Sequence, residues 1–582
     1  MLLPKPLKST LKWVALTLYF SILIIIMTYP LVLKMGHTMI GEIGDNIYFV
    51  WMIGWMKKAI FELHVNPFDV WFLNYPEGWN MAYTEITPIM LALAIPFAFL
   101  GGPTFAYNAA MMLSFVLAGL FMFLWVEHLT ERKDAALVAG TIYAFVPYHF
   151  AHFLIGHLNL SGIQWFPLYF MGLYDLLEQN RVRPERSNWK PAILAGISLG
   201  LIGWTSQYYL YMTLFISLAF ALTYIIRVNW KMITRKLFWL NWMVMGLAAL
   251  PLVGVAILPY VTLAGQGGLP DRGIGITEMY SASPTDFVLP STLHFIWGQW
   301  VGATFNRDMW VEGTLYVGMV ALVLAVIAWL KRKESRHVHL MPALLVSILT
   351  ATILAMGIDL HWNGEVVRLA TPSFLIPLIG KENFPIVLPG FFLFKYFPFF
   401  AKLRALMRFG VFNLVLISAM AGLGSAWVLN KVRPSRRLAV TVLILLLVGI
   451  DFFPRPFNQF AEVAPRPVDS WLAQQPGEGA VVQMPFIKAE DQDQTYFTLT
   501  YNKPYIGGFF NAFPPHQYQE IKPALASFPD EQSVALLKKL GTEYVLVDEA
   551  SYTDMDAIRS QCEALGLEFK AEIGDQMVFV LR

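Results

Sequence analysis

Two acidic residues, Glu42 and Asp45, stand three positions apart in the segment GEIGD that follows the first long apolar stretch of the chain. A carboxylate placed there can meet water and a lipid-borne substrate at one surface. It can act as a general base or hold a divalent cation such as Mg²⁺ or Mn²⁺. The competing interpretation is that Asp45 caps the helix expected at residues 47–60. Asp45 is the candidate catalytic residue, and Glu42 is a candidate for substrate or cation binding.

A second polar set, at residues 149–159, contains His149, His152, His157 and Asn159 in the segment PYHFAHFLIGHLN. Imidazoles can bind a metal ion or a substrate, although this spacing matches no recognised zinc motif. Histidines at a membrane surface also form ordinary hydrogen bonds with headgroups or backbone. We treat His152, His157 and Asn159 as candidate substrate-binding residues.

Arg404 and Arg408 form a third set, four residues apart at the start of an apolar segment. On a helix they would share one face, where they could clamp a phosphate, or they could reach out to lipid headgroups. Gln207 and Tyr208 fall between two apolar segments. They could hydrogen-bond and stack on a sugar, or belong to the aromatic belt of a membrane protein.

These side chains need an apolar framework to hold them. The 582 residues are 57% hydrophobic and only 14% charged, which excludes an ordinary soluble protein. The net charge of +2 and the absence of a basic, aromatic-interleaved face argue against nucleic-acid binding. Cys562 is the single cysteine, so an internal disulfide is excluded. Spanning segments are expected at residues 13–33, 105–126, 135–151, 159–177, 191–206, 208–226, 238–262, 312–330, 339–357, 405–429 and 438–453.

The distribution of Lys and Arg orients this membrane domain. With eleven crossings and a cytoplasmic N-terminus, every basic cluster falls on the inner side. The clusters lie at residues 5–12, 132–133, 181–190, 227–236, 331–336 and 431–437. Residues 87–100 are apolar but short and contain Pro88 and Pro96, so we expect an interfacial or re-entrant helix there. The long connections then face outward.

The last part of the chain changes character after a proline-rich stretch. Strand-like segments at residues 481–486, 543–548 and within 567–582 alternate with helical patterns near 531–540 and 553–564. Such alternation predicts a small extracytoplasmic α/β domain at residues 455–582, after a mainly α membrane domain at residues 1–454.

Several short segments together resemble the GT-C superfamily of membrane glycosyltransferases, in particular bacterial and archaeal members. The segments are Gly44-Asp45 with Trp51 following, NYPEGWNM (74–81), PYHFAHFLIGHLNL with QWFPL (147–168), PSTLH (290–294), LRALMRFG (403–410) and the tail segments PRPVDSWLAQQP, VVQMPF, NKPYIGGF and LGTEYVLVDE. The resemblance covers most of the chain.

The resemblance implies a polytopic bundle of about eleven spans plus the interfacial or re-entrant helix. It also implies inverting transfer of a hexose or pentose from a polyprenyl-phosphate-linked donor to an envelope glycan, lipid or protein. Asp45 would match the first-loop acidic residue, as a general base or cation ligand, and Arg404 or Arg408 would steady the departing lipid phosphate. The chain departs from the family in offering His152 and His157 where others have an acidic residue, and Glu42-x-x-Asp45 is not an Asp-x-Asp pattern.

Two other functions fit a polytopic chain: a transporter or flippase, and a non-catalytic envelope assembly protein. A transporter would carry polar groups along a path and would commonly show inverted repeats, whereas here the polar groups gather at one face. The sequence leaves the sugar, the acceptor and the oligomeric state open.

Overall fold

The computed structural model describes residues 5–182, 185, 187–265, 270–374, 376–380, 382–487, 492–510 and 514–582. The basic positions 183 and 186 of the charge analysis lie outside these residues. The chain divides into two compact units, each built from separate stretches of sequence. The first unit contains residues 1–30, 111–154 and 160–458, and the second contains residues 31–110, 155–159 and 459–582.

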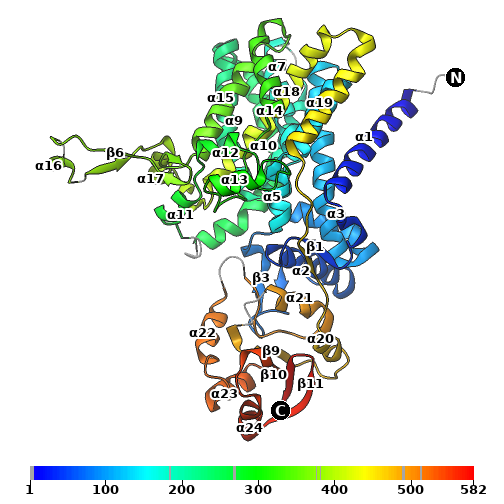
Figure 1. Cartoon of the computed structure of the whole chain (residues 1–582), viewed down its shortest axis with the longest axis vertical. Coiled ribbons are helices and arrows are strands. Elements are labelled where there is room, and N and C mark those ends of the chain that lie inside the picture. The colour runs from blue at the N-terminus through cyan, green and yellow to red at the C-terminus, as the bar shows by residue number, and fades with distance from the viewer. Residues whose placement is uncertain are drawn as a thin grey trace. The chain divides into compact units, whose positions relative to one another are not determined.

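Long apolar helices make up the first unit (Figure 1). They are α1 (Lys5–Met27), the later part of α3 (Pro88–Thr130), α4 (Lys133–Ala144), α5 (Pro147–Ile155), α7 (Trp165–Val182), α8 (Trp189–Thr205), α9 (Gln207–Val228), α10 (Lys236–Gly265), α14 (Met319–Leu330), α15 (Leu340–Ala355), α18 (Val411–Lys431) and α19 (Arg437–Phe452). Each apolar segment expected from the sequence is occupied by one of these helices or by a pair of them. The predicted mainly α membrane bundle is therefore confirmed.

Six helical stretches of the described residues are long and apolar enough to cross a bilayer. They are 10–27, 88–130, 133–155, 207–228, 236–265 and 406–431, and two shorter apolar helices lie at 319–330 and 340–355. The number of crossings and the side on which each terminus lies stay predictions.

Small residues let the helices of the first unit approach closely. A Cβ atom on Gly196 of α8 would come within 2.4 Å of the Met245 carbonyl oxygen in α10. Likewise, a Cβ atom on Gly424 of α18 would come within 1.9 Å of the Leu324 carbonyl oxygen in α14. Between helices in an apolar solvent, such close backbone packing is a main source of association.

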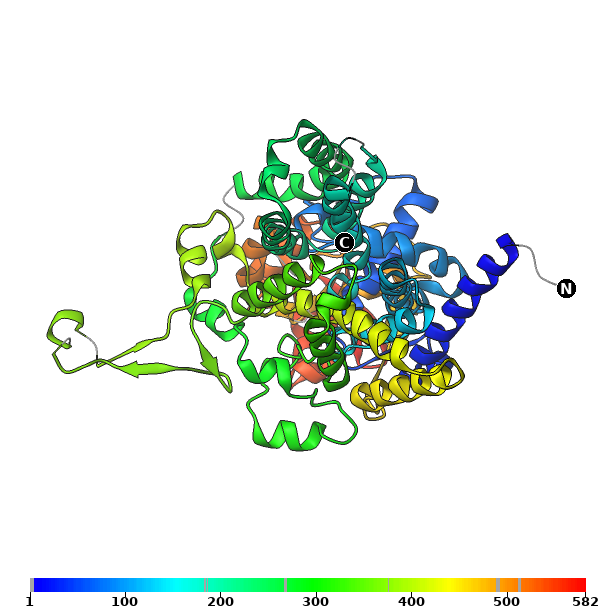
Figure 2. The ribbon, with the colours of Figure 1, turned by 90° about the horizontal axis from the view of Figure 1, so that it is seen from above.

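The connections of the first unit contain short elements. They are the helices α11 (Ile274–Met279), α12 (Pro284–Val288), α13 (Gly298–Thr304), α16 (Ile376–Ile379) and α17 (Pro389–Tyr396), the 3₁₀ turns η4 (Trp230–Thr234), η5 (Arg332–Glu334), η6 (Phe400–Lys402), η7 (Leu406–Gly410) and η8 (Pro434–Arg436), and the strands β4 (His361–Trp362), β5 (Glu365–Val366), β6 (Arg368–Ala370) and β7 (Asn383–Pro385). Antiparallel β6 and β7 form an arm that extends from the helices of this unit (Figure 2).

A break divides α3, the helix that contains the segment expected to be interfacial or re-entrant. Gly101 (φ −145°) and Gly102 (φ 81°) leave the helical conformation, and Pro103 follows them. A positive φ is easily adopted by glycine, so the GGP sequence ends one helical segment and starts another. Residues 88–100 are thus a separate helical segment, as the sequence predicted, and their position relative to the bilayer stays a prediction.

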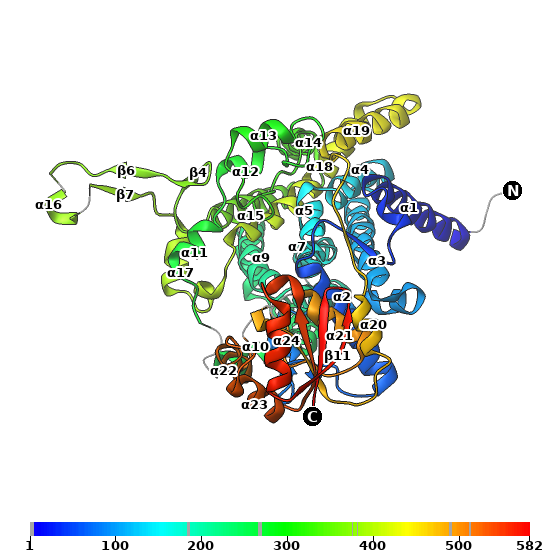
Figure 3. The same ribbon diagram turned by 60° about the horizontal axis from the view of Figure 1, so that its bottom comes forward.

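The second unit contains a four-stranded sheet of order β11-β12-β10-β9 (Figure 3). Its strands are β9 (Ala480–Met484), β10 (Thr542–Asp548), β11 (Leu567–Ile573) and β12 (Gln576–Leu581). β9 is parallel to β10, and the other pairs are antiparallel. Helices α23 (Glu531–Lys539) and α24 (Met555–Ala564) complete the alternation, and the predicted strands and helices of this α/β region are confirmed.

The rest of the second unit joins the first predicted outer loop to the C-terminal region. Its further elements are η1 (Leu31–Leu33), β1 (Thr38–Ile40), α2 (Asp45–Lys57), the π-helix η2 (Lys58–Leu63), β2 (Asp69–Val70), β3 (Trp79–Asn80), η3 (Met81–Tyr83), β8 (Phe460–Glu462), α20 (Pro467–Leu472), α21 (Gln492–Tyr501), α22 (His516–Ala524) and η10 (Glu549–Ser551), with the short α6 (Leu158–Ser161) at its boundary with the first unit. β1 pairs antiparallel with β8.

Helix α2 is fixed against α21 within this unit. The Trp51 indole donates a 3.1 Å hydrogen bond to Thr498 Oγ1, and a Cβ atom on Gly54 would come within 2.4 Å of Leu499. The buried face of α2 therefore gives Asp45, at its first turn, a rigid support. The boundary at residues 454 and 455 expected for two domains stays a prediction.

Candidate active site

Asp45 is the first residue of α2 and its carboxylate is 40% exposed. The residue before the helix is Gly44, whose position leaves no side-chain cap. The alternative interpretation, that Asp45 caps a helix beginning at residue 47, is therefore wrong. Because its side chain does not cap the helix terminus, the Asp45 carboxylate stays partly exposed to solvent.

Asn46 holds the turn that presents Asp45. Its side-chain Oδ1 accepts hydrogen bonds from the backbone N–H groups of Gly44 and Ile47, both at 2.8 Å. Its Nδ2 donates to the backbone carbonyl of Glu42, also at 2.8 Å. Asn46 is fully buried, so these bonds are shielded from water and fix the loop from residue 42 to residue 47. Glu42 itself is exposed and lies before the helix, not on one face of it with Asp45.

His157 is the partner of Asp45. Its Nε2 lies 3.5 Å from Asp45 Oδ2, and its side chain is 17% exposed. The turn before it contains Gly156 at φ +83°, where an added Cβ would come within 2.4 Å of the Asn46 backbone nitrogen. Only glycine permits this close approach, which places the His157 ring beside the Asp45 carboxylate.

Asn159 contacts the carboxylate of Glu85, a residue that the sequence analysis did not single out. Its Nδ2 donates a 3.1 Å hydrogen bond to Glu85 Oε2. Glu85 lies in the same long predicted outer loop as Asp45, shortly before Pro88. A signal was present in the sequence, since Glu85 is an isolated acid next to an apolar segment.

Tyr48, one helical turn after Asp45, is fully buried. Burial raises the pKa of its hydroxyl, and the negative charge of Asp45 raises it further. The hydroxyl therefore stays neutral at physiological pH, so it is a poor choice for the base of this region.

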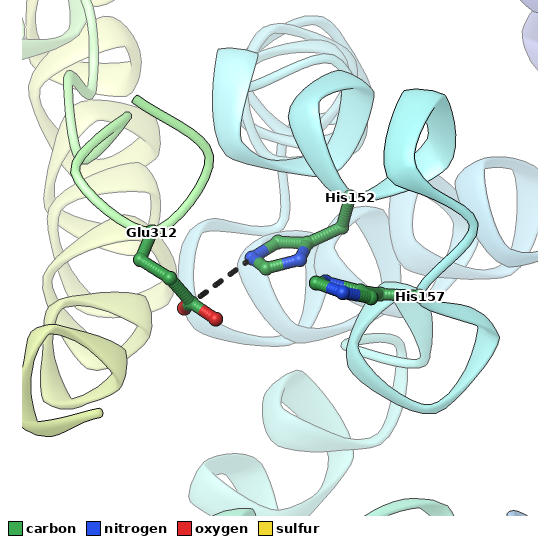
Figure 4. A group of neighbouring side chains, drawn as sticks. All are labelled: His152, His157 and Glu312. Carbon is green, nitrogen blue, oxygen red and sulfur yellow. Dashed lines mark ion pairs between the residues drawn. The ribbon is translucent and has the colours of Figure 1, made fainter. Parts of the chain in front are cut away.

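A charged cluster within the first unit is built around Glu312. Arg408 donates from Nε to both Glu312 oxygens at 3.1 Å and from Nη2 to Oε1 at 2.6 Å. His152 Nε2 lies 3.9 Å from Glu312 Oε2, and the two side chains point toward each other in Figure 4. His152, Glu312 and Arg408 are all buried. Figure 4 also labels His157, which belongs to the second unit.

Aromatic residues enclose this cluster. The Arg408 guanidinium lies 4.9 Å from the centre of the Tyr208 ring, a cation–π contact, and the Tyr148 ring lies 4.2 Å from the His152 ring. Glu312 was missed by sequence reasoning, although a single acid at the start of an apolar segment is unusual. Gln207 accepts a 3.3 Å hydrogen bond from the Tyr260 hydroxyl.

The expectation that Arg404 and Arg408 share one helical face is wrong. The helical turn η7 begins at Leu406, so Arg404 precedes it. Arg404 is exposed, donates a 2.5 Å hydrogen bond to the Tyr280 hydroxyl and lies 4.7 Å from the centre of that ring. Arg408 is buried and its charge is paired with Glu312, so the exposed Arg404 is the better candidate for an outside phosphate.

His149, part of the histidine set, has a structural role. Its ring stacks on Phe115 with centroids 3.5 Å apart, and its nitrogens lie 2.8 Å from Ser114 Oγ and 3.0 Å from the Ala144 carbonyl oxygen. For this histidine the interpretation as an ordinary hydrogen-bonded residue is correct.

Comparisons with known proteins bear on the fold. A family model described as "Domain of unknown function (DUF6311)" matches residues 18–381. The search among curated proteins found no match. Among solved structures, the chain is similar to the Archaeoglobus fulgidus oligosaccharyltransferase in its apo form, with a TM-score of 0.51 and 12% identity over 92% of this chain and 69% of the other.

A second similar structure is the arabinofuranosyltransferase AftD from mycobacteria, with a TM-score of 0.54 and 12% identity. The match covers 98% of this chain but 41% of the mycobacterial protein. At such identities the likeness establishes a shared fold. The GT-C resemblance read from the short sequence segments is thereby confirmed for the fold, over most of the chain.

Proposed function

Because the chain belongs to the family described as "Domain of unknown function (DUF6311)" and has the GT-C fold, we propose that it is a membrane glycosyltransferase. The donor is a sugar linked to a polyprenyl phosphate, and the acceptor is an envelope glycan, lipid or protein at the outer membrane face. The observation that carries this proposal is the accessible Asp45 carboxylate beside His157, held by a rigid turn in the first predicted outer loop.

The proposed reaction is a single displacement. The acceptor hydroxyl oxygen attacks the anomeric carbon of the donor sugar, while its proton passes to a carboxylate oxygen of Asp45. The bond between the anomeric carbon and the phosphate oxygen breaks, and the polyprenyl phosphate leaves with both bonding electrons. Attack from the face opposite the leaving group inverts the anomeric configuration. His157, 3.5 Å from the carboxylate, keeps Asp45 oriented toward the acceptor.

Other side chains have proposed binding roles. Arg404, exposed and braced by Tyr280, would hold the lipid phosphate, because a planar guanidinium offers several donors to phosphate oxygens. In the first unit, Arg408 and the neighbouring Tyr208 and His152 would contact the donor. In the second unit, Asn159 and Glu85 would contact substrate hydroxyls.

A divalent cation is compatible with the carboxylates of the second unit. Glu42 is exposed and Asp45 is partly exposed, and carboxylate oxygens are the ligands that Mg²⁺ and Mn²⁺ prefer. A bound cation would neutralise charge on the departing phosphate. Treatment with a chelator followed by addition of either metal tests the requirement directly.

The decisive experiment measures sugar transfer by the purified full chain in lipid nanodiscs. Radiolabelled sugars on short polyprenyl phosphates are offered together with envelope extracts, and the covalent product is counted. Asp45→Asn should reduce turnover by about 10²–10⁴-fold, the usual contribution of a general base. Asp556→Asn, at an exposed aspartate in the first turn of α24, is the matched control. Full activity of Asp45→Asn would overturn the assignment. In a parallel experiment with proteoliposomes, label that crosses the membrane without forming a product would indicate a transporter.

A further inference from the structure

A small cavity lies in the first unit, outside the groups used so far. Its volume is about 180 Å³, below the roughly 300–1,000 Å³ of pockets that hold drug-sized ligands. Its lining includes Asp286, Asn306, Arg307, Trp310, Gly313 and Met407. Met407 and Gly313 are the chain neighbours of Arg408 and Glu312, so the cavity lies beside the buried charged cluster of this unit.

Three charged side chains line the cavity, and two of them, Asp286 and Arg307, are nearly buried and paired, whereas Asp308 is exposed. Arg307 Nη1 donates to Asp286 Oδ1, and the side chains are 10% and 9% exposed. The other Asp286 oxygen accepts a 2.8 Å hydrogen bond from the Ser283 backbone N–H and completes a capping box for α12. Since the Asp286–Arg307 pair is neutral as a whole and Asp308 adds a negative charge, the wall does not favour an anionic ligand over a neutral one.

Arg307 has hydrogen-bond donors that its ion pair with Asp286 does not use. Its Nε and Nη2 groups form no hydrogen bond with any residue that the structure describes. The Arg307 side chain is 10% exposed, so these N–H groups have limited contact with water and can donate to oxygen acceptors inside the cavity.

The remaining lining fits hydroxyl groups and a ring. Asn306 offers an amide, and its Oδ1 is held by the backbone N–H of Asp308 at 3.0 Å. Trp310 is half-buried and supplies a flat apolar surface. A planar indole beside an amide and a guanidinium with free donors matches a molecule that has an apolar ring face and hydroxyls at its edge.

We propose that this cavity binds one sugar ring of a saccharide substrate, with Arg307 donating to ring hydroxyls and Trp310 packing against the ring face. The proposal rests on the proposed glycosyltransferase activity and names the site that recognises the sugar. The ring belongs either to the donor or to the acceptor, because both carry the same chemistry.

Saturation-transfer NMR on the full chain in nanodiscs tests binding without any turnover. The probes are methyl glycosides of hexopyranoses and pentofuranoses, and the sugar-free control is a short polyprenyl phosphate. At least one glycoside should bind the wild type, and Asp286→Asn/Arg307→Gln and Trp310→Ala should each weaken it at least tenfold. The double change leaves the net charge and the shape of the wall nearly unchanged, which protects folding. Thermal unfolding checks that both variants are folded.

Arg368→Gln and Trp297→Ala are the matched controls, since both side chains are exposed on other elements of the same unit. Equal affinity in all variants, or the absence of glycoside binding to the wild type, would overturn the proposal. In the transfer assay, a raised KM for the lipid-linked sugar alone assigns the ring to the donor, and a raised KM for the acceptor alone assigns it to the acceptor. Glycoside binding without any sugar transfer would support the cavity as a sugar site and reject the proposed glycosyltransferase activity. Sugar transfer that is unchanged in the cavity variants would support the activity and reject the cavity as a sugar site.

Discussion

The imidazole of His157 lies 3.5 Å from the carboxylate of Asp45, although the two residues come from loops far apart in the sequence. Both belong to the second unit, and the close packing of Gly156 on Asn46 sets their separation. In the proposed reaction the carboxylate, the more exposed member of the pair, is the base, and the imidazole is its orienting partner.

Replacing His157 should therefore lower kcat more than it changes KM. We expect His157→Ala to reduce kcat about 10–100-fold, because a mispositioned base loses part of the usual general-base contribution. His157→Gln keeps an N–H donor and should retain more activity than the alanine variant. His516→Ala, at an exposed histidine of α22, is the control. Steady-state kinetics of sugar transfer measure the changes in kcat and KM separately. An unchanged kcat in His157→Ala would contradict the positioning role.

Gly156→Ala should disturb both stability and transfer. An alanine at φ +83° costs about 1–2 kcal/mol in strain, and its Cβ would also overlap the Asn46 backbone. Gly566→Ala is a matched control in the same unit, because Gly566 has φ +86° but no atom within 4 Å of an added Cβ. Thermal unfolding in detergent should show a clearly larger loss for Gly156→Ala. Equal losses in the two variants would mean that the contact with Asn46 does not hold the site.

Local patterns predicted the elements of the C-terminal sheet because its strands are short apolar runs between turn residues. VVQMPF and EYVLVD each contain β-branched residues in a buried strand, and the structure places β9 and β10 there. The division of α3 was also visible, since prolines and paired glycines interrupt the apolar run near residue 101. In these segments neighbouring residues decide the conformation.

Partners distant in the sequence could not be predicted. Arg408 is paired with Glu312, which lies 96 residues away in the sequence. The two arginines at helical spacing therefore differ, since Arg408 is buried and Arg404 is exposed. The pairing of β1 with β8 joins the first predicted outer loop to the tail in the same way. No local pattern reports such contacts, because each depends on how helices and loops pack after they form.

Glu278 and Asp359, which lie in two different connections of the first unit, form a carboxyl pair that should make stability depend on pH. Burial and a hydrogen bond with Glu278 raise the pKa of Asp359 to about 6 from 3.8. The folded state therefore binds a proton more tightly than the unfolded state. The stabilising contribution of Asp359 to the free energy of unfolding is fully present below pH 3.8 and is lost as the pH rises through about 6.

Asp359→Asn keeps the hydrogen-bonding capacity without the charge. It should unfold at a higher temperature than the wild type at pH 7.5, by an amount equivalent to at most about 2 kcal/mol, and the difference should disappear near pH 4. Asp308→Asn, at an exposed aspartate of the same unit, should show no such trend. A pH-independent difference between Asp359→Asn and the wild type would show that the carboxyl pair does not share a proton.

The buried ion pair of Arg408 and Glu312 should behave as a unit. Both side chains are less than 10% exposed, so removing one leaves an uncompensated charge in an apolar environment. Arg408→Met and Glu312→Gln should each destabilise the protein by about 3–5 kcal/mol, whereas the double variant should recover much of that loss. Thermal unfolding in detergent, with the four proteins compared as a double-mutant cycle, measures the coupling. Additive losses would contradict a shared buried pair. Preserved stability together with lost transfer in the double variant would assign the charges to substrate binding instead of folding.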